Sequence, residues 1–344
     1  MKILADVDLP YLSQLFPKPF EVTTYDSYQS LLSMLPFHNI LICRSTLRVN
    51  ETLLAQSNIQ CVATASSGTD HIDQHYLNSK QIHLFDAKGC NAQAVADYVT
   101  ATLAWLEKHN KITGNCAGII GIGAVGSQVL KRLYLAGYIV QSYDPYKTPI
   151  DNQHQVNSLQ ALTHCDVLCI HANLHQQLPY PSLNLINAEF LSRLKPDATI
   201  INASRGGIIN ENDLLQLKQP ITYCTDVFLH EPDINPNIVD LATLCTPHIA
   251  GHSIEAKQNA MIQLSVQLHA YFNLNPPIQL TQQTESLNYF HRVQPWQDLI
   301  LGLYNPYDDT QIIKNALDKK NAFITQRKAH TQRHDFAVSE PLFA

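Results

Sequence analysis

Residues 117–126, Ala-Gly-Ile-Ile-Gly-Ile-Gly-Ala-Val-Gly, decide the fold of this chain. An apolar run typical of a buried strand leads into a turn with the pattern G-x-G-x-x-G, and a helical pattern follows. A second apolar run ends at Asp144, about 20 residues beyond the last glycine. This order of strand, turn, helix, strand and acid predicts a dinucleotide-binding unit, whereas a glycine turn alone also occurs in α/β proteins that bind no nucleotide.

Each residue type in this pattern has a physical role. Gly121 permits a tight turn, Gly123 lets the backbone approach a pyrophosphate, and Gly126 allows close packing of helix and strand. The helix start offers free N–H groups and the positive end of its dipole to phosphates. Asp144 would accept hydrogen bonds from both ribose hydroxyls and repel a 2′-phosphate, which favours NAD over NADP. The predicted cofactor contacts at the turn are Gly121, Gly123, Ala124, Val125 and Gly126.

The composition restricts the class of protein. The 344 residues are 45% hydrophobic and 15% charged, which predicts a globular chain of two or three domains. The net charge is −6 and no long basic run occurs, so neither nucleic acid nor a membrane is an expected partner. The N-terminus lacks the apolar region of a signal peptide, and the apolar segment 92–106 is too short to cross a bilayer. We therefore expect a soluble, cytoplasmic protein.

The 8 cysteines and 16 histidines raise the question of disulfides and metals. The cysteines form no C-x-x-C pair and most lie in apolar runs, so we expect reduced thiols in the core. His71 and His75, and likewise His171 and His175, are spaced i,i+4 but lack the glutamate of H-E-x-x-H. No metal site is predicted.

Strand and helix patterns alternate along most of the chain and predict a fold of two α/β domains. A doubly wound parallel sheet of the Rossmann type is expected to be inserted into a smaller, flavodoxin-like α/β domain. The predicted domains are a substrate-binding domain of residues 1–92 and 252–284, an NAD-binding domain of residues 93–251, and a short C-terminal dimerisation segment of residues 285–344. Predicted strands of the central sheet are 118–121, 139–143, 167–171, 199–202, 222–226 and 244–246.

Three polar residues follow late strands of the predicted central sheet, where open α/β sheets bind their ligands. Arg205 follows one strand, Glu231 the next and His248 the last. Oxidation of a secondary alcohol by NAD needs a base, and His248 fits this role with Glu231 holding its ring. Arg205 would bind an adjacent carboxylate through its planar fork, and Asp226 could accept from the nicotinamide carboxamide. Taken singly, each residue is as easily explained by a surface ion pair, a turn cap or an ordinary loop histidine.

The motifs that carry these residues are Asn-Ala-x-Arg-Gly, Asp-Val-Phe-x-x-Glu-Pro and Pro-His-Ile-Ala-Gly, in that order behind the glycine turn and Asp144. This series is similar to that of the D-isomer-specific 2-hydroxyacid dehydrogenase family. Within that family, segments such as Cys43-Arg-Ser45 and 63–71 resemble the erythronate-4-phosphate dehydrogenase branch. The resemblance implies NAD-dependent oxidation of 4-phospho-D-erythronate to (R)-3-hydroxy-2-oxo-4-phosphobutanoate in pyridoxal 5′-phosphate biosynthesis, by a homodimer.

The resemblance also assigns site residues. It implies that the catalytic residues are Arg205, Glu231 and His248. The implied NAD contacts are Asp144, Asn173, Asp226 and Gly251, and the implied substrate contacts are Ser45, Ser66 and the residue at position 252. The chain departs from the branch at several of these positions: Ser66 and Asn173 stand where threonine is usual, Leu174 where proline is expected, and His252 where a tyrosine contacts the substrate.

Two alternatives stay open, the first because of these departures and the second because a fold alone does not establish catalysis. The enzyme could act on a different 2-hydroxy acid, or the fold could serve a non-catalytic NAD-binding regulator. A substrate phosphate would need cations near the strand ends of the first domain, and the candidates there are Arg44, Arg48 and Lys88.

Overall fold

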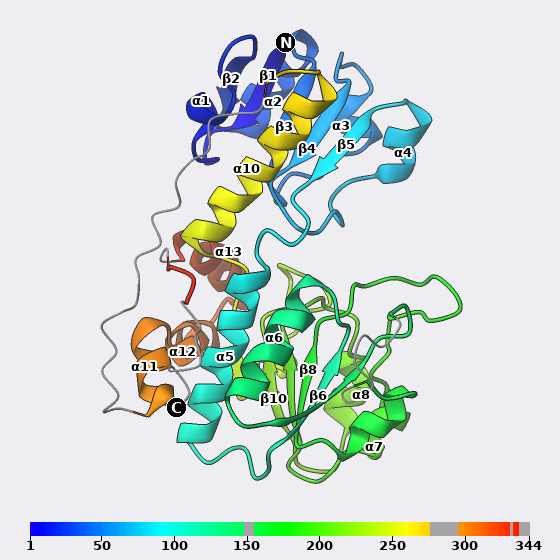
Figure 1. The fold of residues 1–344 in the computed structure, drawn as a ribbon, viewed down its shortest axis with the longest axis vertical. Helices are drawn as coiled ribbons and strands as arrows, with labels where there is room; N and C mark the ends of the chain where they lie inside the picture. The colour runs from blue at the N-terminus through cyan, green and yellow to red at the C-terminus, as the bar shows by residue number, and fades with distance from the viewer. Residues whose placement is uncertain (148–154, 276–294, 331–332, 337–344) are drawn as a thin grey trace. The chain divides into compact units, whose positions relative to one another are not determined.

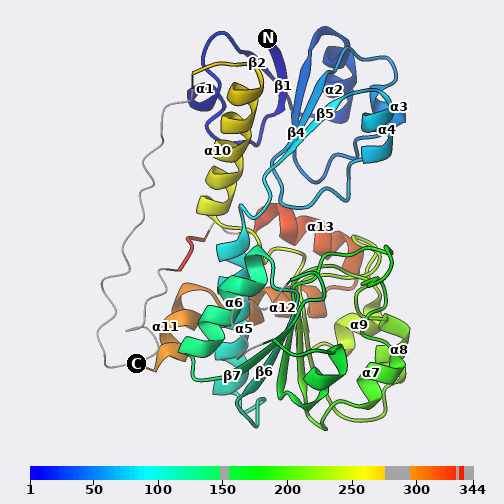
Figure 2. The same cartoon turned by 45° about the vertical axis from the view of Figure 1, so that its right-hand side comes forward.

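The computed structural model describes residues 1–147, 155–275, 295–330 and 333–336, which fall into two compact units (Figures 1 and 2). The first unit comprises Met1–Asn91 and Ser253–Glu285, and the second comprises Ala92–His252 and Ser286–Ala344. The second unit thus interrupts the sequence of the first. In the described part of the chain, no helix is long and apolar enough to cross a membrane.

The first unit is built on a five-stranded parallel sheet whose order is β2-β1-β3-β4-β5, the flavodoxin-like order. All residues of the central strands β3 and β4 are buried, as expected for a sheet covered on both faces. The strands are β1 (Lys2–Asp6), β2 (Glu21–Tyr25), β3 (Ile40–Cys43), β4 (Cys61–Thr64) and β5 (His83–Asp86). The helices are α1 (Leu12–Leu15), α2 (Tyr28–Met34), α3 (Glu51–Leu54), α4 (Gln74–Ser79) and α10 (Ile254–Tyr271), with the 3₁₀ turn η1 (Leu35–Phe37).

Helix α10 comes from far along the chain and completes one hydrophobic face of this sheet. Met261, Leu264 and Leu268 are fully buried in a cluster with side chains of β1, β3 and β4. Ser253 caps the helix by accepting a hydrogen bond from the N–H of Ala256. The first unit therefore contains two segments of chain that are widely separated in sequence.

The second unit is built on a six-stranded parallel sheet of order β11-β10-β9-β8-β6-β7. Outside β7, Gln155 forms an isolated parallel bridge with Ser142. When this bridge is taken as a minimal third strand, the order becomes the 3-2-1-4-5-6 arrangement of dinucleotide-binding folds, with one strand added. The strands are β6 (Cys116–Ile120), β7 (Ile139–Tyr143), β8 (Val167–Ile170), β9 (Thr199–Asn202), β10 (Thr222–Thr225) and β11 (Leu244–Cys245).

Helices cover this sheet, and two of them are joined by a buried ion pair. The Arg132 Nη2 of α6 lies 2.6 Å from the Asp97 Oδ1 of α5, and both side chains are almost completely buried. The other Asp97 oxygen accepts a hydrogen bond from the N–H of Phe336 near the end of the described chain. The helices are α5 (Ala92–Lys108), α6 (Ala124–Leu135), α7 (Ala188–Ser192), α8 (Glu211–Gln216) and α9 (Pro236–Leu241), with the 3₁₀ turn η2 (Leu159–His164).

The C-terminal region adds the helices α11 (Trp296–Leu303), α12 (Pro306–Asn315) and α13 (Lys319–Ala329) to the second unit. Ile300 of α11 is buried against Ala101 and Ala104 of α5. Thr310 of α12 accepts a hydrogen bond from the N–H of Cys245, the last residue of β11. The described tail thus packs on its own chain, beside the sheet of the second unit (Figure 1).

The predicted fold class is confirmed, including the insertion of a Rossmann-type sheet into a flavodoxin-like domain. The strand predicted at 118–121 runs instead from Cys116 to Ile120, because Gly121 has a φ of +90° and turns the chain. All eight cysteines are free thiols. The described C-terminal helices belong to the same compact unit as the Rossmann-type sheet.

Candidate active site

The glycine-rich turn after β6 is shaped by close contacts with its neighbours. A methyl group added to Gly126 would lie 2.0 Å from the carbonyl oxygen of Gly121, which is too close for any side chain. At Gly121 the added carbon would lie 2.7 Å from the nitrogen of Ala172. At Gly123 it would meet no atom within 4 Å. Two glycines are therefore needed by the fold, while the third borders open space into which a ligand can fit.

The start of α6 and the end of β7 complete this cradle. Gly123 is the N-cap residue of α6 and has no side chain to cap the helix, so the first N–H groups remain available to a phosphate. The Asp144 carboxylate accepts hydrogen bonds from the N–H groups of Ile122, at 2.9 Å, and Tyr146, at 3.0 Å. Asp144 is thereby held directly beside the turn, where an acid that binds ribose hydroxyls is expected. The donor set fits a dinucleotide.

Three loops at the carboxyl ends of β9, β10 and β11 are joined in the second unit. A methyl group on Gly206 would lie 1.9 Å from the Phe228 carbonyl oxygen, so the first loop rests directly on the second. The Asp226 carboxylate, after β10, accepts from Thr246 Oγ1 at 2.7 Å and from the N–H groups of Ile249 and Ala250 at 2.8 Å. The loops that carry Arg205, Glu231 and His248 therefore form one assembly.

His248 and Glu231 form the central contact of this assembly. The Nδ1 of His248 lies 2.6 Å from the Oε2 of Glu231, and the other Glu231 oxygen accepts from the N–H of Phe228 at 2.9 Å. His248 has a φ of +57°, a strained conformation for a residue with a side chain. Because Nδ1 faces the carboxylate, Nε2 is the nitrogen left to exchange a proton with a substrate.

The charges around Glu231 have opposing effects on its ionisation. Burial raises the pKa of Glu231, but His248, the N–H of Phe228 and the Arg327 guanidinium outweigh it and hold the pKa below its usual value. Arg327, on α13, has its Nη1 at 3.9 Å from the Glu231 Oε2. Glu231 is therefore an anion through the neutral pH range, as a residue that orients a histidine ring must be.

Arg205 lies in the loop after β9, and several hydrogen bonds fix its backbone. Its carbonyl accepts from the Asn202 side chain at 3.1 Å, while its Nη1 donates to the Ser204 carbonyl at 2.8 Å. Asn202 also accepts from the N–H and hydroxyl groups of Ser204. This loop holds the guanidinium at the same sheet edge as His248.

The other predicted cofactor residues are also found at this edge. Asn173 is exposed just after β8, and its carbonyl accepts from Ser182 Oγ at 2.5 Å. Gly251 follows Ala250 in the loop held by Asp226. Asp226 itself is only 1% exposed, and its carboxylate accepts hydrogen bonds from that loop. Burial raises the pKa of Asp226. The sequence reasoning missed the backbone of Ala172, which lies against the glycine turn.

The predicted substrate residues are divided between the two units. Ser45 is exposed after β3, and Ser66 follows β4, with its Oγ 2.8 Å from Thr64 Oγ1 and donating to the Gly68 carbonyl. His252 belongs to the second unit, where its ring centroid lies 5.9 Å from that of His330. Ser45 and Ser66 thus belong to the first unit, and His252 belongs to the second.

Among the cations proposed for a substrate phosphate, Arg44 already has partners. Its guanidinium forms ion pairs with Asp6 at 2.9 Å and Asp8 at 2.7 Å. The two carboxylates offset its charge and make it a poorer phosphate ligand than the sequence suggested. Arg48 and Lys88 carry no such pair of acids in the described contacts.

The surroundings of the i,i+4 histidine pairs do not suit a metal ion. His71 Nε2 lies 2.9 Å from Thr64 Oγ1. His171, just beyond β8, is buried, and burial lowers its pKa to about 3. Within residues 1–147, 155–275, 295–330 and 333–336, no three His, Cys, Asp or Glu side chains gather in a way that could hold a metal ion.

Comparison with known proteins indicates one enzyme family. Residues 91–250 match the family model of the D-isomer specific 2-hydroxyacid dehydrogenase NAD binding domain. The chain is 50% identical to an erythronate-4-phosphate dehydrogenase of Legionella pneumophila, over 98% of this chain and 96% of the relative. A namesake from Coxiella burnetii is 33% identical over 98% of this chain and 94% of its own. The fold is also that of an NAD-dependent formate dehydrogenase from Staphylococcus aureus, solved with NAD, with a TM-score of 0.65, 22% identity and coverage of 81% and 97% of the two chains.

Proposed function

Because the chain belongs to the erythronate-4-phosphate dehydrogenases, within the D-isomer-specific 2-hydroxyacid dehydrogenases, we propose that it oxidises 4-phospho-D-erythronate to (R)-3-hydroxy-2-oxo-4-phosphobutanoate. In this role it would serve pyridoxal 5′-phosphate biosynthesis. The single observation that carries the proposal beyond family membership is the 2.6 Å contact between His248 and Glu231 at the edge that also holds Arg205.

The proposed chemistry assigns one task to each residue. Bound NAD would supply the acceptor for the hydride of substrate C2. His248 Nε2 takes the proton of the C2 hydroxyl, while Glu231 stabilises the imidazolium that forms. Arg205 binds the C1 carboxylate through both arms of its guanidinium and orients C2. The cofactor would be held by the glycine turn, Asp144, Asn173 and Gly251, with Asp226 supporting the loop that carries Gly251. The substrate would contact Ser45, Ser66 and His252.

The glycine turn allows the cofactor role to be separated from the structural one. We expect Gly123→Ala to keep the melting temperature of the wild type and to weaken NAD binding about tenfold, because the added methyl fills space that the pyrophosphate needs. Gly126→Ala should lower the melting temperature as well, because its methyl must displace the Gly121 carbonyl. Differential scanning fluorimetry with and without NAD measures both effects. Equal loss of stability in the two variants would contradict this division.

A substrate panel tests the proposed reaction. The purified protein should reduce NAD with 4-phospho-D-erythronate, or oxidise NADH with the 2-oxo product where the equilibrium opposes NADH formation. Other D-2-hydroxy acids, phosphorylated and not, are assayed in parallel. His252, which replaces a tyrosine expected at this position, is the observation that favours a different acid. Turnover of another acid with none of 4-phospho-D-erythronate would overturn the substrate assignment, and NAD binding without any turnover would favour a regulator.

We also propose a homodimer in the cytoplasm. The apolar side chains of Ile312 and Leu317, in and just after α12, are exposed on the chain by itself and support an additional contact there. Light scattering of the purified protein measures the assembly directly, and a monomer at micromolar concentration would contradict the proposal.

A further inference from the structure

Helix α13 places one face against the loop that carries Glu231. Lys320, Phe323 and Arg327 have the i, i+3, i+7 spacing of a single helix face. Phe323 is 1% exposed and packs edge-on against Phe228, with ring centroids 6.2 Å apart. Lys320 lies 3.8 Å from Asp233, and Arg327 lies 3.9 Å from Glu231. Three contacts thus join this helix face to the loop between Phe228 and Asp233.

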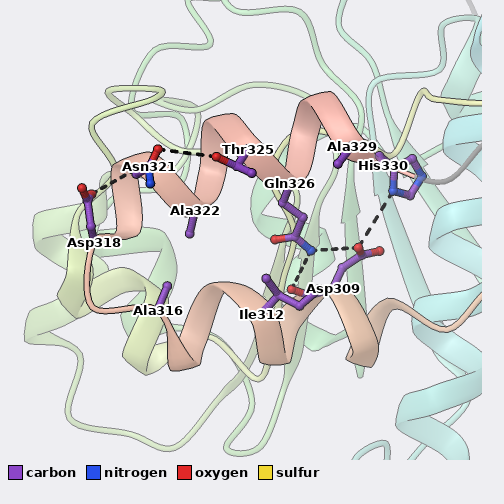
Figure 3. Close-up of a pocket in the computed structure, with 10 residues that line it drawn as sticks. All are labelled: Asp309, Ile312, Ala316, Asp318, Asn321, Ala322, Thr325, Gln326, Ala329 and His330. Atoms are coloured by element: carbon purple, nitrogen blue, oxygen red, sulfur yellow. Dashed lines mark hydrogen bonds and ion pairs between the residues drawn. The ribbon is translucent and has the colours of Figure 1, made fainter.

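A neighbouring side of α13 is fixed to α12, so the face that carries Phe323 and Arg327 cannot easily turn away. The Gln326 side chain donates to the Asp309 carbonyl at 2.9 Å and to its carboxylate at 2.8 Å. His330 lies 3.9 Å from the same carboxylate. Figure 3 shows Gln326 and His330 converging on Asp309 from one side of the pocket between the two helices. Arg327 therefore lies on a helix whose position is fixed by contacts with α12.

The charges facing Glu231 come from several elements, and the Arg327 guanidinium is among those that lower the pKa of Glu231. His248, in the loop after β11, contacts Oε2 directly. Arg327 approaches the same oxygen from α13, while Glu211 of α8 adds an opposing negative charge nearby. His230, the preceding residue, acts on Glu211. Loss of Arg327 would remove a positive charge from one side of the Glu231 carboxylate and leave the negative charge of Glu211 nearby.

We propose that Arg327 is a positioning residue of the active site, which holds the Glu231 carboxylate in the orientation that grips His248. The inference rests on the proposed function of the His248–Glu231 pair. It gives the C-terminal region a part in catalysis within its own subunit, independent of any dimer contact. The guanidinium acts through Glu231 and need not touch the substrate.

The pH dependence of Arg327→Met tests the proposal. We expect kcat to fall roughly tenfold, and the acid limb of the kcat profile to move to higher pH by about half a unit, because a lost cation makes protonation of the pair easier. The dissociation constant for NAD should not change. Arg327→Lys, which keeps the charge, should recover most of the rate and return the acid limb toward its original position. Lys328→Met is the matched control, because Lys328 is exposed on the same helix, and it should behave as the wild type.

Other outcomes overturn the inference in distinguishable ways. Superimposable pH profiles for Arg327→Met and the wild type would show that Glu231 needs no second cation. A uniform loss of rate with a lower melting temperature, no shift of the acid limb and no recovery by lysine would reduce Arg327 to a structural role. Full activity of Glu231→Gln and His248→Asn would instead remove the proposed function on which the inference rests.

Discussion

Replacing His248 with asparagine should lower kcat by about a thousandfold, because the amide cannot take the hydroxyl proton. Asparagine suits this test because it tolerates a positive φ better than other residues with side chains, and His248 has a φ of +57°. The Asp226 hydrogen bonds to the following two N–H groups do not involve the imidazole, so the loop should keep its shape. Stopped-flow and steady-state assays measure the rate, and fluorescence titration with NADH measures cofactor binding.

The cofactor affinity of this variant should stay within about twofold of the wild type, since the change removes chemistry and leaves the glycine turn intact. His164→Asn is the control, because His164 is an exposed histidine of η2 at the opposite end of β8 from His171. A variant at position 248 that retains a tenth or more of the wild-type rate would exclude this histidine as the base.

Replacing Asp97 with alanine should reduce the free energy of unfolding by about 3–5 kcal/mol, because it leaves the charge of Arg132 buried without its carboxylate. The two side chains are 0% and 3% exposed, so water cannot take the place of the lost partner. The N–H of Phe336 also loses its acceptor. Urea unfolding followed by circular dichroism measures the loss.

The double variant Asp97→Ala with Arg132→Met separates the charge from the packing. It removes both ions together and should recover a large part of the stability, since a buried pair is often replaceable by apolar groups. If the single and double variants were equally unstable, the loss would come from the cavity and not from the unpaired charge. Arg193, whose pair with Glu189 lies largely in solvent, offers the exposed comparison.

Much of the fold and the centre of the site could be predicted because both depend on short sequence patterns, namely apolar runs and the polar residues that follow them. Buried parallel strands are short apolar runs, and Ile40–Cys43, Ile139–Tyr143 and Thr199–Asn202 occur where those runs predict them. In parallel sheets the carboxyl ends of all strands share one edge, so Arg205, Glu231 and His248 could be expected to meet there. The 2.6 Å contact of His248 with Glu231 agrees with that expectation.

What the sequence left open depends on contacts between distant segments. Arg44 looked available for a phosphate, but Asp6 and Asp8 lie in a different strand and its following turn, and no local pattern links them to it. Arg327 stands in a polar helix almost a hundred residues beyond Glu231, and nothing in its neighbourhood marks it as part of a site. Phe323, four residues before Arg327, is an apolar residue on this polar helix, and the structure buries it.

The first unit is made of two segments separated by residues 92–252, and this separation affects the order of folding during synthesis. The ribosome finishes the five strands of the N-terminal sheet early, yet the residues that cover one of its faces, Met261, Leu264 and Leu268, are translated last of that unit. Ile3, Ile40 and Cys61 stay uncovered by α10 until residues 92–252 have been made. The sheet that emerges first is therefore covered only after residues 92–252 of the second unit have been made, and a nascent chain stopped before residue 254 would expose that apolar face to chaperones.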